Sequence, residues 1–187
     1  MILAAALATS LSAQPIAMQK VIDGAKRQVG VTRMYDARYR AIPYPGGDVP
    51  LDRGVCTDVL VRAYRNAGVD LQVLVHEDMK RNFDRYPHDW GARAPDANID
   101  HRRVPNLATF FARNGKTLRI SSRGADYKPG DIVAWVLTAG VPHIGIVSDV
   151  PVRGTDRYLI VHNVGLGAKI EDVLFAYRVT GHYRFPG

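Results

Sequence analysis

The hydrophobic pattern of the chain changes from helical to extended beyond residue 115, and this change constrains the fold more than any other feature. Before that point, residues 15–30, 56–67 and 104–115 each place apolar side chains on one face of a helix, and a glycine closes each segment. Helices followed by strands predict an α+β fold, with the N-terminal helices packed on a C-terminal antiparallel sheet. The predicted strands lie in four segments rich in β-branched and aromatic residues, DIVAWVL, HIGIVSDV, RYLIVHNV and VTGHYRF.

The length and composition are those of a single globular domain. With 187 residues, of which 47% are hydrophobic, the chain can bury a core without a disulfide, a metal or a partner, and we expect a monomer. Residues 40–54 hold three prolines and three glycines and are therefore predicted to form a structured loop. Residues 70–104 are predicted to form a short helix followed by the polar loop RAPDANIDHRRVPN.

Residues 1–14 differ in composition from the rest of the chain. They form an apolar run of small residues, similar to the hydrophobic region and cleavage end of a signal peptide, although the positively charged start of such a peptide is missing. The alternative is an N-terminal extension or the front of a helix. The run is too short to span a bilayer, so stable membrane insertion is not expected. We expect a periplasmic or secreted protein whose single domain covers residues 15–187.

The chain is strongly basic. It has 25 Lys and Arg against 18 Asp and Glu, a net charge of +7, which favours anionic partners such as nucleic acid, a membrane surface or a cell-wall polymer. The basic residues are scattered, however, and form no block typical of a nucleic-acid-binding arm. Nucleic acid is therefore not the expected partner, although charge alone does not choose among the others.

The chain has one cysteine, Cys56, at the start of a predicted helix. A single cysteine excludes an intramolecular disulfide and a cysteine-rich zinc site. At a helix N-terminus, unpaired N–H groups and the positive end of the helix dipole favour a thiolate. His143 opens one predicted strand and His162 closes the next, so antiparallel pairing would bring both imidazoles to the same end of the sheet. Together they form a candidate catalytic group, with a cysteine nucleophile, His143 as its base and His162 orienting His143.

Other interpretations of these residues stay open. Asn163 is the alternative third residue, because neighbouring residues of a strand point to opposite faces and only one of the two can serve. A single cysteine is more often a small buried hydrophobic residue, in which case the chain would be a non-catalytic module that binds the cell wall or nucleic acid. Thiol reactivity separates these classes, since a catalytic cysteine is expected to react well below the ordinary pKa of about 8.5.

Several motifs, taken in order along the chain, resemble the NlpC/p60 group of papain-like cysteine peptidases. In that group a Pro-Tyr and Gly-Gly loop precedes the cysteine, a Pro-Gly-Asp opens a strand, one histidine starts a strand and a second closes the next. The matching positions here are Tyr44, Cys56, residues 129–131, His143 and His162. From about residue 20 onward the chain also resembles a bacterial family of unknown function, DUF1287, in the segments GVCTDV, HEDM, NIDHRRVPNL, PHIGIVSD and TGHYR.

The resemblance implies a papain-like fold and hydrolysis of amide bonds in peptidoglycan stem peptides or cross-links. The substrate would be peptidoglycan or a muropeptide, no cofactor would be needed, and Tyr44 would touch the substrate near the nucleophile. The chain departs from the wall peptidases around Cys56, where Val55, Thr57 and Asp58 stand in place of the usual Asp before the cysteine and Ser-Gly after it. We therefore expect Asp58 to bear on substrate choice. Acyl transfer through the same acyl-enzyme intermediate is the enzymatic alternative.

The segment 70–104 is not part of the core shared with that group, and we expect it to shape the substrate cleft. Arg102 and Arg103 are candidates for contacts with an anionic substrate, because guanidinium groups suit carboxylates. The acidic residues and histidines of HEDMKRNFDRYPHDW and DANIDH follow no metal-binding spacing such as HExxH or an EF-hand loop. We therefore expect solvated loops there and no metal site.

Overall fold

The structure, a computed structural model, describes residues 16–186, so the signal-like segment 1–14 lies outside the described residues. Within this range no helix is long and apolar enough to cross a membrane. The helices are α1 (Met18–Lys26), α2 (Cys56–Arg65), α3 (Leu71–Asn82) and α4 (Val104–Asn114). The strands are β1 (Met34–Tyr35), β2 (Arg53–Gly54), β3 (Lys116–Thr117), β4 (Ile132–Val136), β5 (Pro142–Pro151), β6 (Tyr158–Asn163), β7 (Ala168–Glu171) and β8 (Arg178–Arg184).

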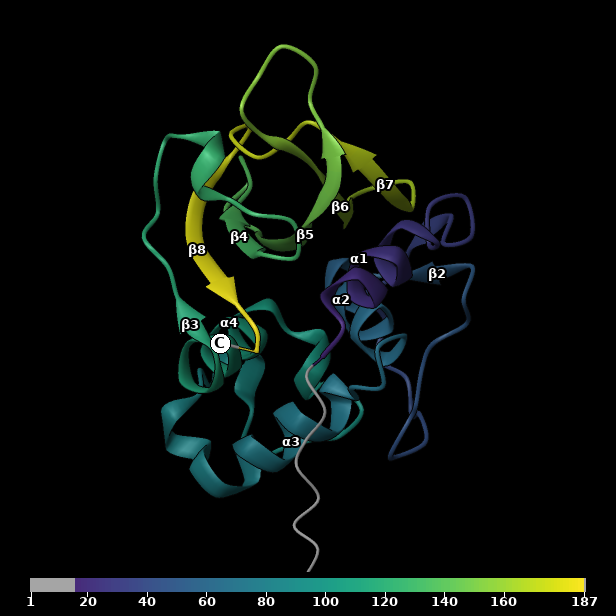
Figure 1. Ribbon diagram of the computed structural model, residues 1–187. Coiled ribbons are helices and arrows are strands. Elements are labelled where there is room, and N and C mark those ends of the chain that lie inside the picture. The colour runs from purple at the N-terminus through teal and green to yellow at the C-terminus, as the bar shows by residue number, and fades with distance from the viewer. Residues whose placement is uncertain (1–15, 187) are drawn as a thin grey trace, which may run out of the picture.

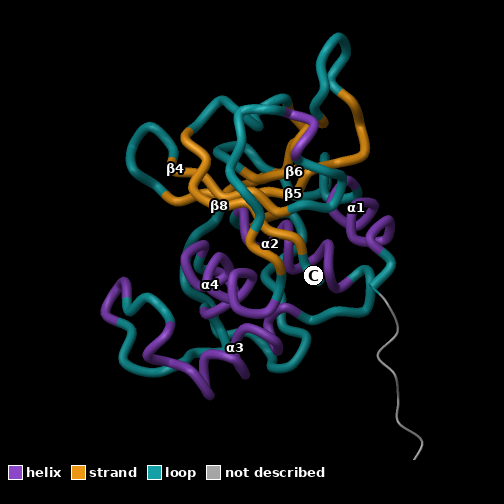
Figure 2. The backbone as a smooth tube through the Cα atoms, turned by 60° about the vertical axis from the view of Figure 1, so that its left-hand side comes forward, coloured by secondary structure: helices purple, strands orange, loops and turns teal. Residues whose placement is uncertain are grey.

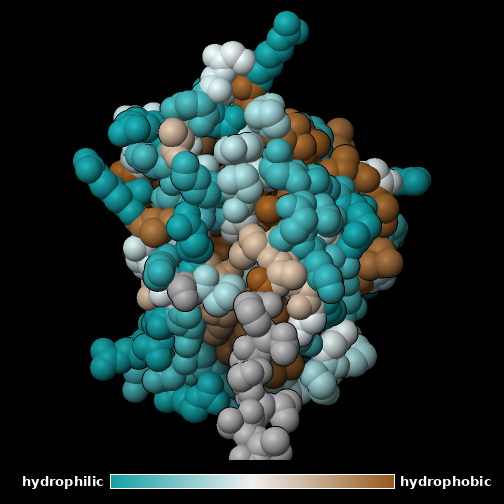
Figure 3. Space-filling model, viewed as in Figure 1, coloured by the Kyte–Doolittle hydropathy of each residue, from teal (hydrophilic) through white to brown (hydrophobic). Residues whose placement is uncertain are grey.

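Strands β3 to β8 form one sheet in the order β3-β8-β4-β5-β6-β7, and every neighbouring pair in it is antiparallel. Figures 1 and 2 show the sheet at one end of the molecule and helices α3 and α4 at the other, with α1 and α2 packed beside β5 to β7. The predicted α+β arrangement is therefore confirmed. The face seen in Figure 3 is mainly hydrophilic, as expected from a chain in which basic residues are scattered over the surface.

The sheet has a hydrophobic core on each face, because successive side chains of a strand alternate. In β4, Ile132 and Ala134 belong to the larger core, which also holds the apolar faces of α1, α2, α3 and α4. Val133 and Trp135 point the other way, into a smaller core under the loops around Tyr127 and Leu174. The larger core holds the start of α2 against the sheet.

A short parallel pair of strands connects two loops at the start of α2. Met34 lies opposite Arg53, and Tyr35 lies opposite Gly54, two residues before the helix begins. Gly54 is needed there, because a Cβ atom at this position would lie 2.9 Å from a carboxylate oxygen of Asp58. The pair fixes Tyr35 beside the first turn of α2.

Arg62, in the middle of α2, fastens the loop that leads into the same helix. Its guanidinium forms a two-point ion pair with Asp48 at 2.9 Å and donates to the carbonyls of Val49 and Arg53 and to the hydroxyl of Thr32. These bonds satisfy backbone carbonyls at the end of the loop and the start of β2, which is why residues 48–52 are ordered without regular secondary structure.

The segment 70–104 contains more helix than the sequence predicts. Helix α3 runs for 12 residues, with Asp70 as its N-cap, and short 3-10 turns follow at Phe83–Arg85, Asp89–Gly91 and Asp100–Arg102. Trp90 has φ of 58°, a left-handed backbone conformation that is unusual for a residue other than glycine. Strand β7 is also absent from the sequence prediction.

Candidate active site

Cys56 is the first residue of α2, and it is almost completely buried, with 2% of its surface exposed. Val55 precedes it in an extended conformation and has no side chain that could cap the helix. The cap is supplied from inside the helix, because the carboxylate of Asp58 accepts the N–H of Val55 at 2.7 Å. The first turn of α2 is thus held in place with the Cys56 thiol at its N-terminus.

Burial raises the pKa of the Cys56 thiol to about 12. The backbone N–H of Ile144 and those of Thr57 and Cys56 itself act in the opposite direction, but they do not outweigh the loss of solvation. The expectation that the helix N-terminus yields a resting thiolate is therefore wrong, because desolvation is the larger effect. The effect of the Ile144 N–H on this pKa places the sulfur near the start of β5, where His143 directly precedes Ile144 in the chain.

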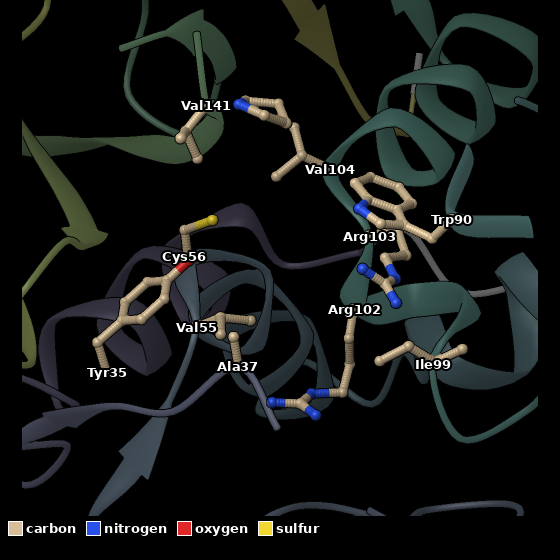
Figure 4. A pocket seen from close by; sticks show the side chains of 11 residues that line it. Tyr35, Ala37, Val55, Cys56, Trp90, Ile99, Arg102, Arg103, Val104 and Val141 are labelled. Atoms are coloured by element: carbon tan, nitrogen blue, oxygen red, sulfur yellow. The ribbon is translucent and has the colours of Figure 1, made fainter. Parts of the chain in front are cut away.

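Tyr35 lies beside the nucleophile. Tyr35 lines the same cavity as Cys56, and Figure 4 shows its hydroxyl turned toward that residue. Burial, with the neighbouring Cys56 and Asp58, raises the pKa of Tyr35 to about 12, so the phenol keeps its proton at neutral pH. Tyr35 is therefore a neutral phenol whose hydroxyl can donate a hydrogen bond beside Cys56.

His143 and His162 form a buried pair. Nε2 of His143 lies 2.9 Å from Nδ1 of His162, and the two rings meet edge to face. His143 is 3% exposed and His162 is fully buried. Burial lowers the pKa of both rings, that of His143 to about 3, so both are neutral at physiological pH. In the described part of the chain, His143 hydrogen-bonds His162 and makes no hydrogen bond to Cys56.

The far side of His162 faces a carboxylate. Nε2 of His162 lies 3.5 Å from Oε2 of Glu171 on the neighbouring strand β7. This nitrogen is buried and makes no shorter polar contact with any described residue. Glu171 acts on His162 by raising its pKa, against the larger lowering by burial.

Asn163 points to the opposite face of β6. Its amide donates to the carbonyl of Gly54 at 2.9 Å, and its carbonyl oxygen is buried without a partner among the described residues. Between the two alternatives for the third residue, His162 is the one that contacts His143. Asn163 instead ties the sheet to the backbone just before Cys56.

A cavity of about 180 Å³ opens next to Cys56. Figure 4 shows the sulfur directed into the space between the loop carrying Val141 and the segment carrying Trp90 and Arg103. The segment 70–104 therefore forms one wall, as predicted. The lining residues are Tyr35, Ala37, Val55, Cys56, Trp90, Ile99, Arg102, Arg103, Val104, Val141 and Pro142.

Asp58 and Arg102, both predicted to bear on substrate binding, are instead paired with each other. Nε and Nη2 of Arg102 lie 2.9 and 3.0 Å from the two carboxylate oxygens of Asp58, and both side chains are buried. Arg102 also donates to the carbonyls of Asp36 and Arg38. The Arg102 guanidinium points away from the cavity in Figure 4. These residues hold the site together, and their charges are matched by each other.

Of the other two residues predicted to contact the substrate, Arg103 borders the cavity and Tyr44 does not. Arg103 borders the cavity, with its guanidinium carbon 4.2 Å above the centre of the Trp90 ring. Tyr44 does not line the cavity, because its hydroxyl bonds Glu77 at 2.9 Å and its ring packs against His76. The aromatic hydroxyl at the nucleophile belongs to Tyr35.

The acidic residues and histidines of the segment 70–104 form local bonds. Nδ1 of His76 lies 2.8 Å from a carboxylate oxygen of Asp100, and Asp96 accepts from Tyr39 and Asn98. In the part of the chain that the structure describes, no three His, Cys, Asp or Glu residues gather as metal ligands would.

Tyr35, Glu171 and Trp90 were missed by the sequence analysis. Tyr35 lies 21 positions before the nucleophile and reaches it only through the β1–β2 pair. Glu171 belongs to β7, whose residues Ala168–Glu171 alternate too briefly to be recognised as a strand. The sequence did offer one signal for Trp90. It is an aromatic residue in a polar segment, which is typical of a binding surface.

Comparisons with known proteins identify relatives of this chain. The profile of the family described as "Domain of unknown function (DUF1287)" matches residues 22–185. The uncharacterized protein YijF of Escherichia coli (strain K12) is 55% identical over 166 residues, which cover 88% of this chain and 80% of YijF. Both sequence comparisons cover most of the chain.

Two solved structures also resemble this chain. NlpC1 from Trichomonas vaginalis has a TM-score of 0.51 at 14% identity, over 94% of this chain and 46% of NlpC1. A protein of Staphylococcus aureus described as similar to lipoprotein, NLP/P60 family, has a TM-score of 0.42 at 15% identity, over 96% of this chain and 45% of its own. The chain thus spans less than half of each solved chain, and the likeness to NlpC1 shows a shared fold.

Proposed function

Because the chain belongs to the DUF1287 family and has a papain-like fold of the NlpC/P60 type, we propose that it is a cysteine hydrolase. Its substrates are amide bonds in the stem peptides or cross-links of peptidoglycan. The observation that carries this proposal is the buried hydrogen bond between His143 and His162, at the strand whose backbone contacts the Cys56 thiol. A nucleophile, a base and a residue that orients the base are the parts that acyl transfer requires.

The two imidazoles form a directional relay. Nδ1 of His143 has no partner within residues 16–186 and is the nitrogen free to accept a proton from Cys56. With Nδ1 unprotonated, Nε2 of His143 carries the hydrogen and donates it to Nδ1 of His162. His162 then carries its own hydrogen on Nε2, toward Glu171. This set of tautomers makes His143 a neutral base with a lone pair directed to the site.

The thiol loses its proton as it attacks, because burial keeps it neutral at rest. Sγ forms a bond to the substrate carbonyl carbon while the thiol proton passes to Nδ1 of His143. The protonated His143 then gives this proton to the leaving amine as the C–N bond breaks, which leaves a thioester on Cys56. Water, activated by the neutral His143, hydrolyses the thioester and regenerates the thiol.

Hydrogen-bond donors at the start of α2 can stabilise the negative charge that develops on the substrate oxygen. Unpaired backbone N–H groups of a helix N-terminus and the protonated phenol of Tyr35 both border the sulfur. The Tyr35 hydroxyl, which lies toward Cys56, can donate to the oxyanion during attack. The net charge of +7 would hold the enzyme to an anionic wall, and a periplasmic or secreted location belongs to this proposal.

The test is to incubate the protein with peptidoglycan and with soluble muropeptides and to identify the products by mass spectrometry. Cys56→Ala and His143→Ala should abolish product formation. Tyr44→Phe should not, because the hydroxyl that it removes donates a hydrogen bond to Glu77. A fragment that gains one water marks hydrolysis, and a fragment joined to an added amine marks acyl transfer. Wall binding without any fragment from the unmutated protein would replace the hydrolase by a binding module.

A further inference from the structure

The cavity beside Cys56 contains one cation that no acidic residue of the same lining balances. Its lining includes two arginines and no aspartate or glutamate. The charge of Arg102 is matched by Asp58 at 2.9 Å. The guanidinium of Arg103, half-buried at the rim, has no ion pair or side-chain hydrogen bond with any residue from 16 to 186. A partly buried guanidinium without a partner is costly, and an anionic ligand would relieve that cost.

Trp90 holds this guanidinium in place. The guanidinium carbon of Arg103 lies 4.2 Å from the centre of the indole, a stacked cation–π contact. Trp90 is 60% exposed and has φ of 58°, so the backbone adopts an uncommon conformation to present an exposed ring. Such outliers collect at ligand-binding positions, where the surrounding structure maintains them. The stacking leaves the five N–H donors of Arg103 in a defined plane.

The acidic residues nearby belong to a different hollow. Asp89, Asp96 and Asp100 line a second cavity, which Trp90 and Arg103 also border. Asp96 and Asp100 are already bonded there, to Asn98 and His76 respectively. The pair Trp90–Arg103 therefore separates an acidic hollow from the cationic cavity that contains Cys56. An anionic group is favoured only on the Cys56 side.

From this geometry we infer that Trp90 and Arg103 form a carboxylate-binding subsite, which selects substrates with a free carboxylate next to the scissile amide. The inference rests on the proposed function and names the chemical class of its substrate. Arg103 would bind the carboxylate through two parallel N–H···O bonds, the geometry that guanidinium and carboxylate share. Substrates amidated at that carboxylate would leave Arg103 unpaired and bind more weakly.

The test measures binding in the Cys56→Ala background, where no turnover is needed. The probes are a soluble muropeptide with free carboxylates and the same muropeptide with these groups converted to amides. Titration calorimetry should show about ten- to a hundredfold tighter binding of the acid form, the range expected for hydrogen bonds to a charged group. Arg103→Gln should remove this preference, and Arg103→Lys, which keeps the charge but not the planar donors, should restore part of it.

Fluorescence gives an independent readout, because the chain has two tryptophans and Trp135 is buried. The acid muropeptide should change the emission of Trp90, and Trp90→Phe should remove that change. Arg153→Gln, an exposed arginine in the turn between β5 and β6, is the matched control and should keep the acid preference. Equal binding of both muropeptides, or an acid preference that survives Arg103→Gln, would overturn the subsite. Acid preference without any cleavage by the unmutated protein would refute the hydrolase and leave the subsite standing.

Discussion

Glu171 places a carboxylate oxygen 3.5 Å from Nε2 of His162, on the side opposite His143. This distance is longer than an ordinary N–H···O hydrogen bond, so the carboxylate acts on the ring mainly through its charge. Glu171 is also shared with Lys169, whose ammonium lies 3.2 Å away. The carboxylate favours the tautomer of His162 that carries hydrogen on Nε2, and through the hydrogen bond between the rings it determines which nitrogen of His143 is free.

Glu171→Ala should lower kcat by roughly tenfold, by analogy with the loss of other residues that orient a catalytic or metal-bound histidine. Glu171 raises the pKa of His162, so its removal should move the acid limb of the pH–rate profile to lower pH. Glu171→Gln can still accept a hydrogen bond but has no charge. Its kcat should lie between those of the unmutated protein and Glu171→Ala. Lys169 lowers the pKa of His162, so Lys169→Ala should move the acid limb the opposite way, to higher pH. An unchanged profile in Glu171→Ala would remove Glu171 from the relay.

Tyr35→Phe should reduce kcat by roughly ten- to a hundredfold, because one donor to the developing oxyanion is lost. Stability should change little, since the ring keeps its contacts. Steady-state kinetics on a muropeptide, with Tyr44→Phe beside it, makes the comparison. If Tyr44→Phe were the impaired variant, the assignment of the active-site phenol to Tyr35 would be wrong.

The Cys56 thiol should react slowly with iodoacetamide at pH 7, because burial raises its pKa to about 12 and the thiolate fraction is small. The rate should keep rising through pH 9 without a plateau. Alkylation followed by mass spectrometry across this range measures it. A plateau with a midpoint well below pH 8.5 would instead indicate a thiolate–imidazolium pair.

Slow alkylation would therefore not show that Cys56 is merely structural. The thiol assay that separates the two classes on sequence grounds loses this power once the sulfur is known to be buried. Product formation by the unmutated protein and by Cys56→Ala becomes the deciding measurement.

Arg102→Ala should lower the free energy of unfolding by about 3–5 kcal/mol, because it leaves the buried carboxylate of Asp58 without its partner. Denaturant unfolding monitored by circular dichroism measures the change. Arg38→Ala breaks an exposed ion pair with Asp36 and should cost about 1 kcal/mol or less. Equal losses in the two variants would show that the Asp58–Arg102 pair has no special role in stability.

The sequence was most informative where local patterns decide the structure. Hydrophobic spacing predicted the helix that begins at Cys56 and the two strands that carry His143 and His162, and β5 and β6 do pair antiparallel. Alternation showed that His162 and Asn163 face opposite sides but could not say which side holds His143. That choice depends on the register, in which Ile146 lies opposite Val161.

Contacts between distant segments could not be predicted. The ion pair of Asp58 with Arg102 joins residues 44 positions apart, and nothing in the spacing of either residue indicates the other. Two adjacent arginines, Arg102 and Arg103, looked equivalent in the sequence. The 3-10 turn ending at Arg102 directs one guanidinium into the protein and leaves the other at the cavity.

The hydrogen bonds and ion pair of Arg62 with the segment 48–53 connect the assembly of the site with the resistance of the chain to proteases. A loop without regular structure is normally the first place that a protease cuts, because it opens locally without disturbing the rest. Here opening would have to break the bonds of a guanidinium rooted in α2, six residues after the nucleophile. The loop and the helix that carries Cys56 should therefore open together, and a molecule with an uncut loop is one whose active site is still assembled.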